Sequence, residues 1–202
     1  MLAVLVLFSI SGGTERARSV LVEYRNEIRE ASRSFGISPR LLASIVYAEH
    51  SLNVRPGEAV LDKVLALSGY NASLGMAQIK VETAQWIEKQ LQERGGMFYN
   101  PLAMKILIEK ENEIVNRLTD PRTNLRYAAA YVGMILKVWQ PLFREAAYEH
   151  QLPSIVATLY SLGLTRFDRT LRLPHGSAKS NCFGDVARSF YDSFELTDEL
   201  PK

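Results

Sequence analysis

The chain has 202 residues, of which 47% are hydrophobic and 23% charged, and its formal net charge is +2. These values fit one globular domain with a sizeable core, and the scattered, mixed charges argue against a nucleic-acid-binding protein. The one cysteine, Cys182, cannot form an intramolecular disulfide. The three histidines, His50, His150 and His175, lack the spacing of metal ligands, so no metal site and no cofactor are expected.

Residues 1–13 form an apolar N-terminal segment, MLAVLVLFSI followed by Ser-Gly-Gly. The apolar run is too short to span a bilayer, but it has the length of the hydrophobic part of a signal peptide. An export signal would have Lys or Arg before the apolar run, and no such residue precedes it here. We interpret it as the remnant of an export signal or membrane anchor, the alternative being a buried segment that docks on the domain. The expected location is therefore the periplasm or cell envelope, with membrane association through this segment.

Residues 14–202 are expected to fold as one domain. An amphipathic pattern predicts a first helix over residues 14–35, which Gly36 ends. Ser38 and Pro39 then start the helix that carries Glu49. The same signals predict further helices over residues 58–67, 81–94, 102–118, 121–141, 153–162 and 186–194. No segment alternates apolar and polar residues between hairpin turns, so the predicted class is all-α.

Glu49 is the most unusual residue of its helix. It lies on the same predicted face as Leu42, Ile45 and Val46, because residues at i, i+3, i+4 and i+7 of a helix share one side. Burial there should raise the carboxyl pKa from about 4.3 towards about 6, so that the group keeps its proton near neutral pH. Such an acid suits protonation of a glycosidic oxygen. The alternative is a carboxylate at the helix end that reaches solvent or pairs with an arginine.

Four sequence pieces follow one another along the chain. They are IVYAEHS at 45–51, SLGMAQI at 73–79, DPRTNLRYAAAYV at 120–132 and ATLYSLG at 157–163. Together they resemble the lytic transglycosylase catalytic domain of the soluble-transglycosylase and goose-type lysozyme superfamily. That family has a helix ending in Glu-Ser, then Gly-Leu-Met-Gln-Ile, Asp-Pro…Asn-Ile and Ala-Tyr-Asn-Ala-Gly segments. The resemblance implies a lysozyme-like single domain, with a glycan groove between two helical halves.

The resemblance also implies roles for five residues. Glu49 matches the catalytic acid/base, and Gly75 matches a glycine that lets the backbone approach the substrate. Met76 and Gln78 match residues that line the groove, and Tyr160 matches a tyrosine that steadies the catalytic Glu by a hydrogen bond. Simpler explanations exist for four of them: a turn glycine, a methionine that fills core volume, a glutamine that caps the next helix, and a core tyrosine with a satisfied hydroxyl.

Three features depart from the family pattern. His50 stands where the family has Ser after the Glu, and Ser161 replaces the Asn of the fourth segment. The stretch after the Glu49 helix is also longer than expected, and it contains Glu58 and Asp62. These departures concern the contacts with substrate more than the acid itself.

The family's reaction uses one carboxylate, where glycosidases usually use two. By this resemblance, Glu49 would cleave the bond between N-acetylmuramic acid and N-acetylglucosamine in peptidoglycan and leave a 1,6-anhydromuramoyl end. Two alternatives stay open. A hydrolytic muramidase or chitosanase-like glycosidase would need a second carboxylate, for which Glu58 and Asp62 are the sequence candidates. A non-catalytic peptidoglycan-binding module could use the same fold.

Overall fold

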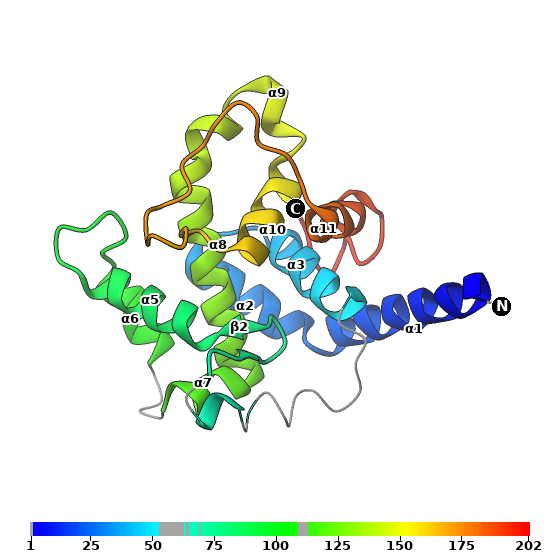
Figure 1. The fold of residues 1–202 in the computed structure, drawn as a ribbon, viewed down its shortest axis with the longest axis horizontal. Helices are drawn as coiled ribbons and strands as arrows, with labels where there is room; N and C mark the ends of the chain where they lie inside the picture. Colours follow the sequence, from blue (N-terminus) through cyan, green and yellow to red (C-terminus); the bar gives the residue numbers. More distant parts are fainter. Residues whose placement is uncertain (1, 53–62, 64, 69, 109–112) are drawn as a thin grey trace.

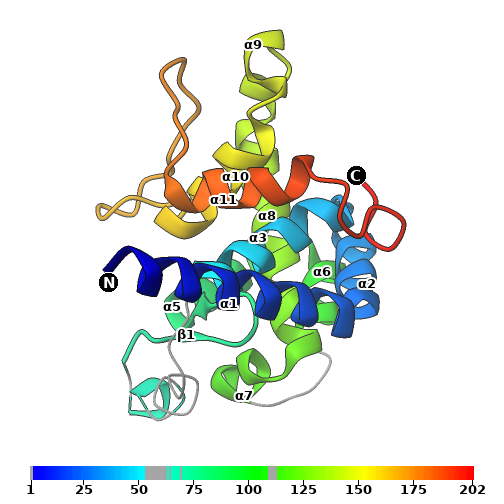
Figure 2. The same cartoon turned by 90° about the vertical axis from the view of Figure 1, so that its right-hand side faces the viewer.

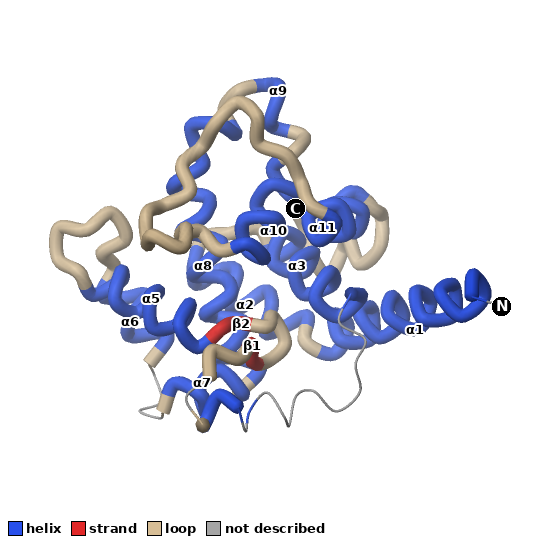
Figure 3. Tube along the Cα trace, in the orientation of Figure 1, coloured by secondary structure: helices blue, strands red, loops and turns tan. Residues whose placement is uncertain are grey.

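The computed structural model describes residues 2–52, 63, 65–68, 70–108 and 113–202, and of residues 2–12 the backbone alone. Helices dominate this part of the chain, and the strands are two short pieces (Figure 1, Figure 3), which confirms the all-α class. The elements are α1 (Leu2–Glu23), α2 (Arg25–Phe35), α3 (Pro39–Leu52), β1 (Ser73–Leu74), β2 (Ile79–Lys80), α5 (Val81–Gln92), α6 (Pro101–Leu107), α7 (Ile114–Thr119), α8 (Pro121–Phe143), α9 (Ala146–Glu149), α10 (Leu152–Leu162) and α11 (Cys182–Asp192).

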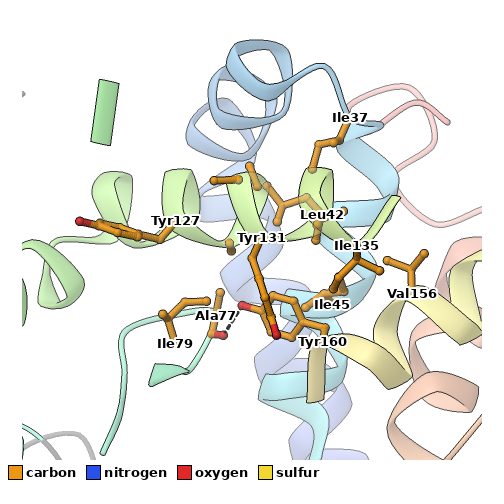
Figure 4. Packing of buried hydrophobic residues seen from close by; sticks show 14 of the residues in the cluster. Ile37, Leu42, Ile45, Ala77, Ile79, Tyr127, Tyr131, Ile135, Val156 and Tyr160 are labelled. Carbon is orange, nitrogen blue, oxygen red and sulfur yellow. Dashed lines mark hydrogen bonds between the residues drawn. The ribbon is translucent and has the colours of Figure 1, made fainter. Parts of the chain in front are cut away.

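Two helices, α3 and α8, form the centre of the molecule. Every residue of α3 from Arg40 to Glu49 is buried, as expected for a helix with apolar residues on all sides. Helices α1, α2, α10 and α11 pack against α3, whereas α2, α6, α7 and α10 pack against α8. Side chains of α3, α8 and α10 meet in one core, among them Ile45, Ile135 and Val156 (Figure 4). The helix that carries Glu49 is thus held from several sides.

A buried arginine fixes the start of α3 against the C-terminal part of the chain. The Arg40 side chain is fully buried, and its guanidinium donates hydrogen bonds to the backbone carbonyl groups of Phe190, Tyr191, Ser193 and Glu195. Burial lowers the pKa of this guanidinium from its usual value. Several carbonyl oxygens replace the lost hydration, which is how a buried charge is tolerated.

The N-terminal helix differs from the prediction. The expected helix over residues 14–35 is two helices, because the backbone leaves the helical path at Tyr24. Residues 2–13 are helical and form the first part of α1, whose N-terminal end projects from the body (Figure 1). No helix in the described part of the chain is both long enough and apolar enough to cross a membrane.

Other predicted boundaries were partly correct. Gly36 ends α2 in the left-handed conformation, and the Asp120 side chain caps α8 by accepting a hydrogen bond from the Thr123 amide. The helix predicted over residues 102–118 is instead the separate helices α6 and α7. Strands β1 and β2, which pair in antiparallel fashion, were not predicted. Strands of two residues are too short to show an alternating pattern.

Candidate functional site

A groove of about 730 Å³ opens where α3, the β1–β2 hairpin, α8, α10 and the loop after α10 meet. Three of the residues predicted from the sequence line it: Glu49, Gln78 and Tyr160. The other two, Gly75 and Met76, are not part of this lining. Residues that the sequence did not single out as site residues complete the groove, among them Asn71, Lys80, Glu82, Tyr131, Arg166, Phe167, Arg172 and Phe183.

Glu49 lies near the C-terminal end of α3, at the wall of this groove. Its exposed fraction is 8%, and Leu42, Ile45 and Val46, which share its helix face, are completely buried. The helical register predicted from the sequence is therefore correct. A carboxyl group in this position is largely removed from water yet still reaches the groove, which is the arrangement that acid catalysis requires.

The Tyr160 hydroxyl lies within the influence of Glu49 but donates its hydrogen bond elsewhere. It donates to the backbone carbonyl of Ala77, at an O···O distance of 2.7 Å (Figure 4). Burial raises the pKa of Tyr160 well above its ordinary value, and the nearby charge of Glu49 adds to the rise. The hydroxyl proton of Tyr160 is thus donated to the turn between β1 and β2. In place of the expected donation to the acid, the structure shows Tyr160 fastening the loop after β1 to α10.

Tyr131 of α8 supports Tyr160 and the loop that follows α10. The two rings are 5.5 Å apart, and the Tyr131 hydroxyl accepts a hydrogen bond of 2.5 Å from the Leu164 amide. Burial raises the pKa of Tyr131 to about 12, so the hydroxyl is neutral in this structure at physiological pH. This tyrosine therefore sets where the chain runs after Gly163, at the far wall of the groove.

The turn between β1 and β2 has an unusual backbone at two positions. Gly75 has a φ of +73°, and a Cβ there would lie 2.4 Å from both the Asn124 side chain and the Leu118 carbonyl oxygen. Gln78 has a φ of +48°, which is uncommon for a residue with a side chain. Its side-chain nitrogen, Nε2, donates a hydrogen bond to the Gly75 carbonyl at 2.9 Å. Gly75 is thus required for close packing of the turn, and the Gln78 side chain stabilises the turn from within.

Asn124, on α8, holds this turn in place. It is completely buried, and its side-chain oxygen accepts a hydrogen bond of 2.9 Å from the Ala77 amide. Its side-chain nitrogen donates to the carbonyl groups of Leu74 and Leu118, at 2.8 and 3.0 Å. One side chain therefore satisfies three buried backbone groups around the turn. The sequence placed Asn124 within the third piece but assigned it no role.

Met76 and His50 meet behind the turn. Met76 packs partly buried against the core, in keeping with the simpler explanation of a methionine that fills volume. His50 makes a hydrogen bond to the backbone of Met76. Burial lowers the pKa of His50, Arg16 lowers it further, and the bond to Met76 opposes this. His50 is thus a neutral link between α3 and the turn, at the position where the family has Ser.

A second carboxylate, Glu82, lines the groove at the start of α5. Its side chain accepts a hydrogen bond of 2.8 Å from the Asn71 amide nitrogen, and its own backbone amide donates to the Asn71 side-chain oxygen at 3.1 Å. The candidates named from the sequence, Glu58 and Asp62, lie outside the described residues. No sequence pattern distinguished Glu82, because an acidic residue in the first turn of a helix is common.

Within the described part of the chain, no group of three or more His, Cys, Asp or Glu side chains could hold a metal ion. Comparisons with protein-family models, with curated proteins and with solved structures found no match to this chain. The residues of the groove and the four sequence pieces are therefore the features that bear on function.

Proposed function

We propose that this chain is a peptidoglycan lytic transglycosylase with a lysozyme-like arrangement, in which Glu49 is the general acid and base. The observation that carries the proposal is the position of Glu49, 8% exposed and at the wall of a groove of about 730 Å³. Removal from water favours the protonated form of a carboxyl group, which is the form that donates to a glycosidic oxygen. The four sequence pieces give the same reaction class.

The proposed reaction has two proton transfers through one side chain. Glu49 first protonates the oxygen between N-acetylmuramic acid and N-acetylglucosamine, and the bond from this oxygen to C1 breaks with its electron pair going to the leaving oxygen. The C6 hydroxyl of the muramoyl residue then attacks C1, and the Glu49 carboxylate takes its proton. The product is a 1,6-anhydro ring, Glu49 regains its proton, and no water is consumed.

The chemistry of the groove lining suits a sugar polymer. Ser73, Lys80 and Thr83 offer polar side chains for hydroxyl and amide groups, whereas Phe167 and Phe183 offer apolar surface for the faces of sugar rings. The loop with Phe167 is ordered by a bridge between Thr165 and Leu171. A lining of mixed polar and aromatic groups is consistent with an extended carbohydrate in this groove.

The test uses Glu49→Gln, with Glu93→Gln on the exposed surface after α5 as a matched control. Glutamine keeps the shape of the side chain but cannot donate or accept the catalytic proton. We expect Glu49→Gln to lower the release of anhydromuropeptides from peptidoglycan by about 1,000-fold, within the range for loss of a general acid, and the control to leave it unchanged. Substantial activity in Glu49→Gln would rule out this acid.

The second candidate is a hydrolytic glycosidase, and the position of Glu82 favours it. A hydrolase needs a second carboxylate as nucleophile or as base for water, and Glu82 is the other carboxylate of the described groove lining. In that case the products would carry reducing ends, and Glu82→Gln would abolish cleavage. A transglycosylase should tolerate Glu82→Gln. Binding to peptidoglycan without any product would support the non-catalytic module.

A further inference from the structure

A second, smaller cavity of about 130 Å³ adjoins the groove at the end of α10 and the loop that follows it. The two hollows share Leu162, Arg166 and Arg172 as lining residues. In Figure 2 the loop between α10 and α11 projects from the helical body, and its residues provide much of the wall of this cavity.

The lining of the small cavity is basic. It contains Arg166, Arg172, His175 and Lys179, and none of the described residues that line it is Asp or Glu. In the described part of the chain, no ion pair joins Arg166, Arg172 or Lys179 to a carboxylate. Asp168 interacts electrostatically with Arg166, which helps to lower the Asp168 pKa, and the Asp168 side chain accepts a hydrogen bond from the Thr170 hydroxyl. Cations that make no ion pair with a carboxylate of the described residues provide a site for an anion.

Arg172 gives the cavity a fixed cationic group. Its Nε donates to the Gly163 carbonyl at 3.0 Å, and its backbone carbonyl accepts a bond of 2.8 Å from the Trp139 indole. Its backbone amide donates to the Leu164 carbonyl at 2.8 Å. Trp139 in turn packs edge-on against the His175 ring. The guanidinium is therefore positioned before any ligand arrives, which lowers the entropic cost of binding.

We propose that this cavity binds a carboxylate group that the substrate carries beside its glycan chain, an inference that rests on the proposed function. At about 130 Å³ the cavity is much smaller than the groove, which suits a small group such as a carboxylate and its nearest carbon atoms. Peptidoglycan strands carry short peptides whose ends are carboxylates. The three lining residues shared with the groove put the cavity beside it, within reach of a carboxylate carried by a strand in the groove.

The experiment measures binding of the full chain with Glu49→Gln, so that strands are not cleaved. The probes are glycan strands with their peptides and the same strands after an amidase has removed them. We expect tighter binding of the peptide-bearing strands, and Lys179→Gln should reduce that preference by about tenfold, as for loss of one charge-assisted hydrogen bond. Arg169→Gln, on the same loop but lining neither cavity, removes the same charge and should keep the preference.

Several outcomes would overturn the inference. Equal binding of the two strand types, or an equal loss in Arg169→Gln, would mean that the cavity does not select the peptide carboxylate. A preference that disappears when hydrofluoric acid removes phosphodiester-linked polymers, with the peptides intact, would assign the cavity to phosphate instead. Failure to bind either strand type would contradict the proposed function itself, which distinguishes the two failures.

Discussion

Asn124→Ala should destabilise the protein strongly through one buried turn. The Asn124 side chain makes three hydrogen bonds of 2.8 to 3.0 Å, to the Ala77 amide and to the carbonyl groups of Leu74 and Leu118. Alanine leaves all three backbone groups without this partner, and each buried group costs about 1–3 kcal/mol when unsatisfied. Allowing for relaxation and entry of water, we expect the free energy of unfolding to fall by about 3–5 kcal/mol.

The assay is equilibrium unfolding in urea, followed by circular dichroism, at constant pH. Asn116→Ala is the matched control, because Asn116 is exposed on the neighbouring α7 and should change the free energy by less than about 0.5 kcal/mol. An Asn124→Ala protein that loses less than about 1 kcal/mol would refute the view that this side chain anchors the turn. So would an equal loss in Asn116→Ala.

Three further predictions concern the same region. Gly75→Ala should lower the free energy of unfolding by about 2 kcal/mol or more, because alanine is strained at this φ and its Cβ would collide with the Asn124 side chain. An unchanged free energy in urea unfolding would contradict this close packing. Tyr160→Phe removes the bond to the Ala77 carbonyl and should cost about 1–2 kcal/mol by the same measurement, whereas an unchanged midpoint would disprove that bond. Because the pKa of His50 is lowered below 6.5 in the folded protein, the unfolded chain binds the proton more readily, and the free energy of unfolding should fall as the pH drops below about 6.5. His50→Asn should show a smaller fall. Identical pH profiles of the two proteins would contradict this prediction.

The sequence predicted the parts of the structure that depend on local signals. Glycine at the end of α2 and the cap at Asp120 were correct, because these positions are specified by the conformation and hydrogen bonding of single residues. The break at Tyr24 was missed, since neither Gly nor Pro marks it. The β1–β2 hairpin was missed because its strands contain two residues each.

The candidate site was predicted in part for a similar reason. Glu49, a carboxylate on an apolar helix face, was detectable from its spacing, and Asn124 could have been found by the same signal, a polar residue within a buried helix. The partner of Tyr160 could not be, because the acceptor is a backbone carbonyl 83 positions away. The presence of Arg172 and Glu82 in the groove lining could not be predicted either, because it depends on how segments far apart in the sequence pack.

The most direct test of the account is mass spectrometry of peptidoglycan digested with the wild-type chain and with Glu49→Gln. If Glu49 is the acid and base of a transglycosylase, the wild type releases 1,6-anhydromuramoyl products, and the variant loses them with its fold intact. Products with reducing ends would contradict the transglycosylase assignment, and equal product release from Glu49→Gln would contradict the role of Glu49.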